Sequence, residues 1–378
     1  MKTIRIATWN INGLRSLIVD DLPSSKFRAG QIKSQITPES NLGHLLSVYN
    51  PNILCFQETR SDAEILSRFQ IPNWRIFSVS SQLEKASRAG NRYSGVSIWV
   101  HTDLPEPQQV IRQLPTLTEP YQPGDLEGRF IALDFGDWVL WNTYVPNAGT
   151  NYKYRTERWD PAITQYLAEL RAQGRMVVWV GDLNVAPTPL DVWFGDPLST
   201  PQGKRFQERW GTDKTGESGF QHQLQILREA HWSTPKMRGV GPLAEAGFTQ
   251  AERNAFQGFL KQGYVDVWRH LHPQTEYDGF SYWSLRAPVY RGMNKGWRID
   301  HVLVDQEHLD RVQDCRNLPE IGTRTKYRAN VGKYGSDHGP VCVTLQLGQF
   351  EVGFENELSI VDSPGGLITD TGIGIVEG

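Results

Sequence analysis

Short runs of β-branched and aromatic residues recur along the chain, and polar, Gly or Pro residues separate them. Apolar runs of this length and composition are typical of buried β-strands. They predict a protein core that is built on β-sheet. The runs cover residues 4–9, 53–56, 94–100, 129–135, 138–144, 176–181, 298–304 and 340–346.

Apolar residues at helical spacing appear between some of these runs. They extend over residues 153–173 and again over residues 249–262. In the second segment, Thr249 and Glu252 fit a T-x-x-E capping box, and Gly263 stands where a helix would end. Helices and strands that are mixed without strict alternation predict α/β layers around a sheet sandwich.

Other parts of the chain lack a clear period. Residues 18–42 are polar, and residues 191–240 are rich in Pro, Gly and charge. We expect both to be surface loop insertions in one catalytic domain that spans residues 1–348, and loops of this length are often functional. The acidic, Gly-rich tail 349–378 favours a flexible segment over an added hairpin.

Charge and cysteine usage narrow the class of protein. The formal net charge is −3, but the tail carries six acids and no Lys or Arg, which leaves residues 1–348 mildly basic at +3. That balance is compatible with a polyanion-binding face without indicating one. Cys55, Cys315 and Cys342 have unrelated spacings, so we expect free thiols and a cytoplasmic location. We expect neither a signal peptide nor a membrane-spanning helix, because no long uncharged apolar stretch is present.

Polar side chains follow several predicted strands at the point where each strand ends. Polar residues at the end of a single strand are common, because they form turns. Here several strand ends carry carboxylates and amides and almost no Lys. Such side chains suit a hard cation such as Mg²⁺, and ligand sites tend to lie at the carboxyl ends of strands. The residues are Asn10 and Asn12, Gln57 and Glu58, Tyr144 and Asn147, and Asp182 and Asn184.

Residues 333–343, KYGSDHGPVCV, place Asp337 and His338 side by side between Gly335 and Gly339. Adjacent residues of a strand point to opposite faces of a sheet. The flanking glycines favour a turn, which can present both side chains to one pocket. The other interpretation is a polar turn that caps the following strand.

Six motifs in this order resemble the endonuclease/exonuclease/phosphatase superfamily, and within it the exonuclease III type of apurinic/apyrimidinic (AP) endonuclease. The resemblance spans roughly residues 1–348 and is interrupted by the two insertions. It implies a deoxyribonuclease I-like, four-layer α/β sandwich, in which two packed mixed β-sheets are flanked by helices. The motifs are TWNINGLR, LCFQETR, YVPNAG, GDLN, GWRIDHVLV and GSDH.

The resemblance implies a metal site. Glu58 matches the principal Mg²⁺ ligand of the family, and Mn²⁺ is expected to substitute. Asn12, a neutral amide, implies a weaker contact, and Asp337 is implied as an outer or second-metal ligand. Asn10 and Gln57 are expected to support these ligands from behind.

The resemblance also implies the groups that act on the phosphate. Asp182 and Asn184 match the pair beside the scissile phosphate, where a carboxylate handles a proton and an amide donates to an oxygen. Tyr144 and Asn147 match residues that hydrogen-bond the phosphate.

His338 matches the catalytic His of the family. Asp300 of GWRID matches the carboxylate that holds this imidazole in one tautomer and stabilises its positive form. The resemblance leaves open which group deprotonates the attacking water and whether one or two metals act.

DNA contacts are implied at four further positions. Trp297 and Tyr282 match aromatic walls that accept a flipped-out abasic deoxyribose and exclude a normal nucleotide. Arg129 and Arg298 are candidate backbone contacts, and either is equally a solvated surface cation.

These implications define a Mg²⁺-dependent DNA-repair nuclease that cleaves 5′ to abasic sites. We also expect 3′-phosphodiesterase and 3′→5′ exonuclease activity on duplex DNA with abasic or 3′-blocked damage, from a monomer. One alternative is a phosphodiesterase or phosphatase of the same superfamily that acts on a non-DNA substrate. Another is a non-catalytic DNA-binding homologue. The balance of the two nuclease activities stays open.

Overall fold

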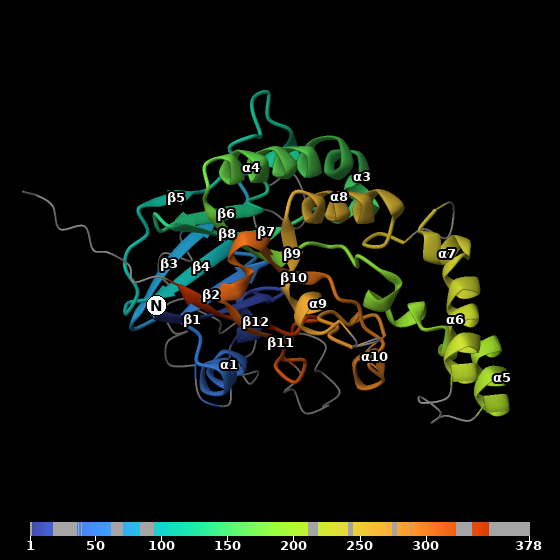
Figure 1. The fold of residues 1–378 in the computed structure, drawn as a ribbon. Helices are drawn as coiled ribbons and strands as arrows, with labels where there is room; N and C mark the ends of the chain where they lie inside the picture. Colours follow the sequence, from blue (N-terminus) through green and yellow to red (C-terminus); the bar gives the residue numbers. More distant parts are fainter. Residues whose placement is uncertain are drawn as a thin grey trace, which may run out of the picture.

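Two six-stranded β-sheets pack face to face and form the centre of the protein (Figure 1). Each sheet is mixed, because β1 pairs with β2 and β7 pairs with β8 in parallel, whereas their other neighbours run antiparallel. Helices cover the outer faces, which confirms the predicted four-layer α/β sandwich. The computed structural model describes residues 2–17, 36, 38, 40–61, 71–83, 94–210, 218–240, 245–273, 278–287, 289–322 and 335–347.

The strand order is β11-β12-β1-β2-β4-β3 in one sheet and β5-β6-β7-β8-β10-β9 in the other. The parallel pairs β1–β2 and β7–β8 therefore lie near the middle of their sheets and face each other across the core. The strands are β1 (Lys2–Asn10), β2 (Ile53–Gln57), β3 (Trp74–Val79), β4 (Val96–His101), β5 (Gln109–Ile111), β6 (Phe130–Asp134), β7 (Trp138–Tyr144), β8 (Met176–Asp182), β9 (Tyr264–Asp266), β10 (Asp300–Asp305), β11 (Val312–Asn317) and β12 (Val341–Leu347).

Apolar side chains from the inner faces of both sheets fill the space between them. Ile6 and Ile98 of the first sheet belong to the same buried cluster as Leu133, Val178 and Val302 of the second. Each fully buried side chain of this size stabilises the fold by roughly 1.5–3 kcal/mol relative to exposure. This central cluster fixes the two sheets against each other, and with them the ends of their strands.

The second sheet is covered by α4 (Asp160–Ala172) and α8 (Gln250–Lys261), and the first by α1 (Asn41–Tyr49). The predicted capping box is present, since Thr249 Oγ1 accepts from the Glu252 amide and Glu252 accepts from the Thr249 amide. Shorter turns are η1 (Leu14–Leu17), η5 (Pro123–Leu126), α3 (Ala148–Tyr154), the π-helical turn η6 (Arg155–Trp159), α9 (Val267–Leu271), α10 (Val289–Gly292) and η11 (Gln306–Arg311).

Every predicted apolar run forms a strand, whereas β3, β5, β9 and β11 were not predicted. β5 and β9 are three residues long, too short to carry a periodic pattern. β3 and β11 are edge strands, and β11 carries polar residues such as Asp314 and Arg316. Edge strands tolerate such residues because one side of the strand faces no neighbour.

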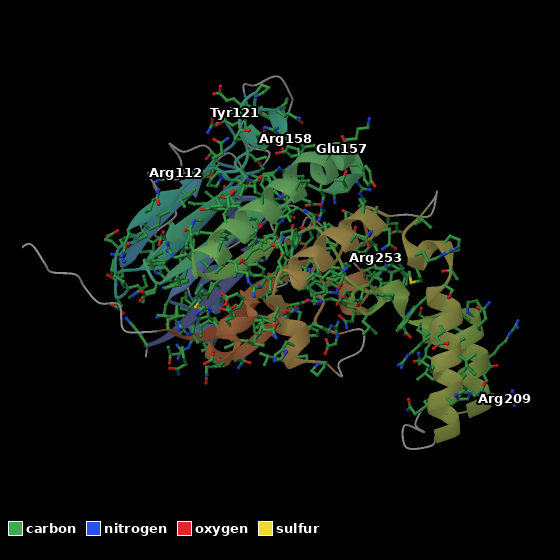
Figure 2. The ribbon with its side chains drawn as sticks, turned by 45° about the horizontal axis from the view of Figure 1, so that its top comes forward. Arg112, Tyr121, Glu157, Arg158, Arg209 and Arg253 are labelled. Atoms are coloured by element: carbon green, nitrogen blue, oxygen red, sulfur yellow. The ribbon has the colours of Figure 1, made fainter. Side chains whose placement is uncertain are left out.

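The described residues of the insertion at 191–240, which was expected to be a loop, are largely helical. The insertion contains the 3-10 turns η7 (Pro189–Asp191), η8 (Trp193–Gly195) and η9 (Pro197–Ser199), followed by α5 (Pro201–Trp210), α6 (Ser218–Trp232) and α7 (Pro235–Arg238). These helices stand to one side of the sandwich, with Arg209 near their far end (Figure 2). Apolar residues are sparse in this segment, and Pro, Gly and charged residues dominate it, so its sequence suggested a loop. The expected tail 349–378 and most of 18–42 lie outside the described residues.

A buried ion-pair cluster fastens the start of this insertion to the second sheet. Arg298 is 1% exposed and donates to Asp191 Oδ1 at 2.8 Å and to Asp266 Oδ2 at 2.8 Å. Burial alone would raise the pKa of Asp191, but the Arg298 and Arg269 cations outweigh it and lower this pKa far below its usual range. Arg298 was expected to be a DNA contact or a surface cation, and its burial between two carboxylates contradicts both expectations.

The cluster predicts a large cost for removing its cation. Replacing Arg298 with Met leaves Asp191 and Asp266 buried without their main partner, so we expect the free energy of unfolding to fall by about 3–5 kcal/mol. Urea denaturation of Arg298→Met measures this change. The control is Arg316→Met, whose half-exposed side chain pairs with Asp314 on the edge strand β11 and is expected to cost about 1 kcal/mol or less. Equal stability of the two variants would contradict a structural role for Arg298.

Candidate active site

The predicted site residues gather at one end of the sandwich, where β1, β2, β7 and β8 finish. Nine of them line a cavity of about 770 Å³. Residues that were far apart in the sequence meet there because the two parallel pairs present their carboxyl ends to the same side. The predicted residues on the cavity wall are Glu58, Tyr144, Asn147, Asp182, Asn184, Tyr282, Trp297, Asp337 and His338.

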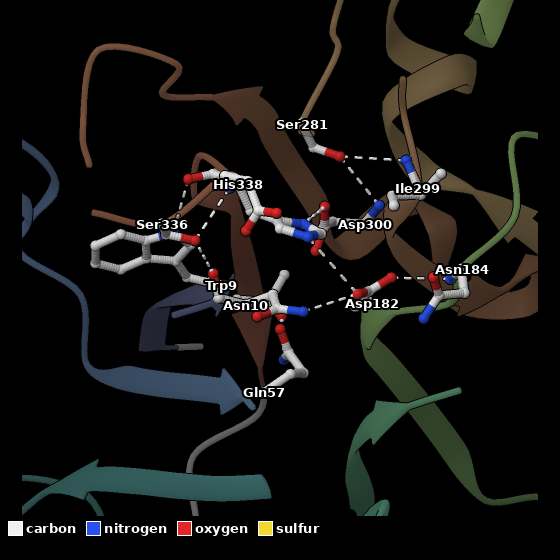
Figure 3. Close-up of polar contacts among 12 residues, drawn as sticks. Trp9, Asn10, Gln57, Asp182, Asn184, Ser281, Ile299, Asp300, Ser336 and His338 are labelled. Atoms are coloured by element: carbon white, nitrogen blue, oxygen red, sulfur yellow. Dashed lines mark hydrogen bonds and ion pairs between the residues drawn. The ribbon is translucent and has the colours of Figure 1, made fainter. Parts of the chain in front are cut away.

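His338 and Asp300 form a hydrogen-bonded pair at the base of this cavity (Figure 3). The imidazole Nδ1 donates to Asp300 Oδ2 at 2.7 Å, which leaves Nε2 directed towards Asp182 Oδ2, 3.9 Å away. The backbone of His338 is also fixed, because its amide donates to Ser336 Oγ and its carbonyl accepts from Trp9 Nε1, both at 3.0 Å. The imidazole is therefore held in one orientation, as the resemblance implied.

Sheet register brings the two carboxylates together. Asp182 ends β8 and Asp300 begins β10, and the antiparallel pairing places them directly opposite each other. Like charges at such a cross-strand position repel. The Oδ1 atom of Asp300 is buried and has no hydrogen-bond partner among the described residues, so this carboxylate depends on His338 for neutralisation.

The pKa values of Asp182 and His338 follow from the close approach of these buried charged groups. Burial and then repulsion from Asp300 raise the pKa of Asp182 to about 7, against the opposing effects of His338 and the hydrogen bonds from Asn10 and Asn184. Burial alone would lower the pKa of His338, but the carboxylates of Asp300, Asp182 and Asp337 outweigh it and raise this pKa. The geometry thus combines an imidazolium with a carboxyl group that exchanges protons near neutrality.

Asn10 connects this group to Glu58. Its amide Nδ2 donates to Asp182 Oδ2 at 2.9 Å and to Glu58 Oε1 at 3.2 Å, so one buried side chain orients both carboxylates. Asn10 was expected to lie behind the metal ligands, and it occupies this position in the structure. Gln57 differs, because its Nε2 donates to Thr8 and Asn142 inside the sandwich. Among the described residues no hydrogen bond joins the side chains of Gln57 and Glu58, and the Gln57 side chain instead links the two sheets through Asn142.

The amides on the opposite wall are joined to each other. Asn147 Nδ2 donates to Asn184 Oδ1 at 3.2 Å, and Asn184 Nδ2 donates to the Val145 carbonyl at 2.8 Å. An amide group carries two N–H donors, so Asn184 keeps one for a ligand. Asn184 has a left-handed backbone conformation with φ 48°, which Asn tolerates better than most residues.

Arg155 was not among the predicted site residues. It supports the two loops that carry Asn147 and Asn184. It is 2% exposed and donates to the carbonyls of Pro146, Leu183 and Asn184 and to Glu252 Oε1, at 2.8–3.2 Å. It lies on the π-helical turn η6, a geometry that often occurs at functional sites. Arg155 precedes Trp159 by four residues, so the stripe that placed Trp159 inside also marked Arg155 as inward-facing.

Tyr144 lies between Arg129 and Glu58. The Arg129 guanidinium stacks at 4.6 Å from the centre of the Tyr144 ring and donates to the Tyr144 carbonyl, and its Nε pairs with Glu127 at 2.6 Å. Arg129 is 2% exposed, which contradicts its expected role as a direct DNA contact or a surface cation. Burial and then the charge of Glu58 raise the pKa of Tyr144 well above its usual value, so its hydroxyl stays protonated as a donor.

Glu58, Asn12 and Asp337 form the predicted metal-ligand set. Burial alone would raise the pKa of Glu58, but Arg60, Tyr144 and Asn10 outweigh it and lower this pKa, so Glu58 is ionised. Asn12 Nδ2 donates to Asp337 Oδ1 at 3.3 Å. Burial and the nearby Glu58 charge raise the pKa of Asp337 against the opposing charges of His338 and Arg60.

This donor set fits a hard divalent cation. It offers two carboxylates that repel each other, together with a neutral amide, and oxygen ligands of this kind suit Mg²⁺. Arg60 also pairs with Glu58 Oε2 and supplies positive charge at the same place. A second cluster, Asp182, Asp300 and His338, has ligand atoms within 4.8 Å of one another. The 2.7 Å hydrogen bond inside that cluster is better explained by a shared proton than by a metal.

Tyr282 and Trp297 lie on the apolar side of the cavity. Their backbones form a bridge, and a second bridge joins Tyr282 to His338. The Tyr282 ring lies 5.0 Å from the His338 ring, and Trp297 packs edge-on against Phe194 at 5.3 Å. The two aromatic residues predicted to form one wall are therefore neighbours beside the imidazole.

Within the part of the chain that the structure describes, no helix is both long and apolar enough to cross a membrane.

A family model described as "Endonuclease/Exonuclease/phosphatase family" matches residues 7–338. Over 348 residues, the chain is 27% identical to a DNA-(apurinic or apyrimidinic site) endonuclease of Dictyostelium discoideum, covering 91% of this chain and 71% of that protein. It is also 27% identical to an exodeoxyribonuclease of Bacillus subtilis, covering 91% and 100% of the two chains.

Solved structures show the same fold. An AP endonuclease from Leishmania major has a TM-score of 0.59 at 22% identity and covers 92% of this chain and 89% of that one. A 3′ phosphatase from Neisseria, bound to a product DNA hairpin, has a TM-score of 0.57 at 22% identity and covers 91% and 100% of the two chains. With the family match over most of the described sandwich, the chain belongs to the endonuclease/exonuclease/phosphatase family.

Proposed function

We propose that this protein is a DNA-repair nuclease of the exonuclease III type, which hydrolyses the phosphodiester bond 5′ to an abasic site. The observation that carries the proposal is the His338–Asp300 pair, whose free imidazole nitrogen lies 3.9 Å from the buried Asp182 beside an aromatic wall. Relatives named AP endonuclease and exodeoxyribonuclease support DNA as the substrate. The catalytic unit is proposed to span residues 1–348 as one domain that acts as a monomer in the cytoplasm.

Asp182 is the proposed general base. Its raised pKa, near neutrality, allows it to take a proton from the attacking water at physiological pH. Asn10 and the Asn184 amide hold the carboxylate in place at 2.9 Å each, so its orientation is set before substrate binds. The water attacks phosphorus in line, opposite the leaving 3′-oxygen.

The remaining groups stabilise charge on the phosphate. Protonated His338 donates through Nε2 to a non-bridging oxygen, while Asp300 holds its Nδ1. Asn147, Asn184 and Tyr144 provide neutral N–H and O–H donors on the facing wall. Donors that are already oriented cost little reorganisation as negative charge develops, and losing one such donor typically costs about 10²–10³ in rate.

Glu58 is the proposed principal ligand of Mg²⁺, with Asp337 and Asn12 as further oxygen ligands and Mn²⁺ as a substitute. When bound, such a cation supplies positive charge beside the phosphate oxygens. Trp297 and Tyr282 form the proposed apolar wall for the abasic sugar. The same site is proposed to remove blocked 3′ ends and to act as a 3′→5′ exonuclease on duplex DNA.

A duplex with one tetrahydrofuran abasic analogue tests the proposed reaction. We expect a single nick on its 5′ side in Mg²⁺ and none in EDTA. His338→Ala is expected to reduce the rate by about 10²–10⁴ while retaining duplex binding, because it removes charge stabilisation rather than binding surface. His101→Gln is the control, since His101 ends β4 at the opposite end of the sheet and pairs with Asp103. An intact duplex together with rapid hydrolysis of small phosphate esters would contradict the proposal.

The metal assignment predicts a binding defect that does not depend on turnover. Glu58→Gln removes the ionised carboxylate, so we expect Mn²⁺ affinity, measured by electron paramagnetic resonance, to fall by about 10-fold or more. The control is Glu307→Gln, a surface Glu near Arg171 on the far side of the second sheet. Unchanged Mn²⁺ binding by Glu58→Gln would place the metal elsewhere.

The pKa of Asp182 predicts the acid side of the pH–rate profile. Only the ionised carboxylate accepts a proton, so single-turnover nicking is expected to rise about tenfold per pH unit below about pH 7 and to level off above it. Duplex binding in EDTA over the same range serves as the control for loss of affinity. A nicking rate that stays constant between about pH 5 and pH 8 would exclude Asp182 as the base.

A further inference from the structure

We propose that Trp193, Tyr290 and Lys295 form a nucleobase-binding subsite on the rim of the same cavity. Its occupant is an unpaired, unstacked base of the DNA strand beside the scissile phosphate. This inference rests on the proposed nuclease function and deepens it. The subsite would hold the base of a nucleotide at a frayed or mismatched 3′ end, which the proposed 3′→5′ exonuclease reaction removes.

The three side chains form one continuous face. The Trp193 and Tyr290 rings have centroids 5.6 Å apart at an interplanar angle of 58°. Lys295 Nζ lies 4.8 Å from the centre of the Trp193 ring and 5.7 Å from that of Tyr290. All three are half-buried and line the cavity that also contains His338 and Asp182.

Trp193 differs from its neighbour Phe194 in what it contacts. Phe194 is buried and packs against Phe248 and Trp297, so it belongs to the small core beneath the insertion. Trp193 is only partly buried against this core, and it also contacts Tyr290, Lys295 and the edge of Phe194 on the cavity wall. Two partly exposed aromatic rings on a cavity wall can stack with a planar ligand, and every nucleobase has a π-face.

The rim is fixed before any ligand arrives. The Trp193 amide donates to the Gly296 carbonyl at 3.0 Å, and the Lys295 amide donates to the Tyr290 carbonyl at 2.8 Å. Val192 bridges Trp297, and Asp191 is held by the buried Arg298. A rigid platform loses little entropy on binding, which favours stacking.

Size and charge both indicate a nucleotide. The cavity of about 770 Å³ falls within the range of roughly 300–1,000 Å³ that encloses drug-sized ligands, whereas a base-less sugar phosphate is much smaller. Lys295, Lys236 and Arg286 all line the cavity and complement the phosphates on either side of a stacked base. An aromatic rim with cations beside it is the combination that single-stranded nucleic acids bind.

Matched DNA substrates test this subsite without turnover. We would measure fluorescence anisotropy in EDTA with two duplexes that differ only at the 3′-terminal nucleotide, which is mismatched in one and a base-less analogue in the other. Base–aromatic stacking predicts that Trp193→Ala weakens binding of the mismatched duplex by about 5- to 150-fold. Binding of the base-less duplex should change less than about twofold, because it has no base to stack.

Two further variants separate stacking from folding. Trp193→Phe keeps a π-face and should retain most of the affinity for the mismatched end, whereas Lys295→Met should weaken both duplexes through lost charge. Tyr121→Ala is the control, because Tyr121 is an exposed aromatic residue at the top of Figure 2, far from the insertion. Thermal melting confirms that each variant folds.

The outcomes distinguish the subsite from the general function. Equal weakening of both duplexes by Trp193→Ala, or no weakening of either, overturns the subsite even if the wild type still nicks the abasic duplex. If the wild type neither binds nor cleaves DNA, the nuclease proposal fails and the subsite fails with it.

Discussion

The candidate site depends on two carboxylates that sheet register forces together. Asp182 and Asp300 occupy opposed positions on β8 and β10, both buried, and no change of rotamer moves their backbones apart. His338 precedes β12 of the other sheet, and its imidazole lies against both carboxylates. The attraction between this imidazolium and the two acids offsets the repulsion between the acids, which are neighbours within the second sheet. Because His338 comes from the first sheet, the site is complete only when the two sheets pack together.

Buried polar groups beyond this cluster follow the same physical rule. A buried charge is tolerated when it is paired and hydrogen-bonded. Arg155 is paired with Glu252 and three carbonyls, and Arg298 with Asp191 and Asp266. These cations set the positions of the loops that carry Asn147 and Asn184 and of the rim at Trp193. They act on the proposed phosphate site through backbone placement, so their side chains need no contact with substrate.

The sequence was sufficient for the strands with strong apolar runs, for the capped helix α8 and for nine residues of the cavity wall, but not for Trp193, Tyr290 and Lys295 on its rim. The sequence did not reveal the role of a charged residue where that role depends on whether its side chain is buried. Arg129 and Arg298 have the composition of surface cations, and only their partners Glu127, Asp191 and Asp266 reveal that they are internal. Those partners are distant in sequence or lie in turns, so no local pattern shows them. The helices of residues 191–240 were missed because Pro, Gly and charged residues dominate that segment and its apolar residues are sparse.

If the paired carboxylates hold His338 as a cation, nuclear magnetic resonance of its imidazole will detect the retained proton. In EDTA, at pH values from about 5 to 10, we expect His338 to stay protonated through neutrality and to lose its proton only well above the ordinary histidine pKa of about 6.5. Asp300→Asn should bring the pKa of His338 down towards that value. An imidazole that titrates at about 6.5 or below in the unmodified protein would show that the carboxylates do not stabilise the cation.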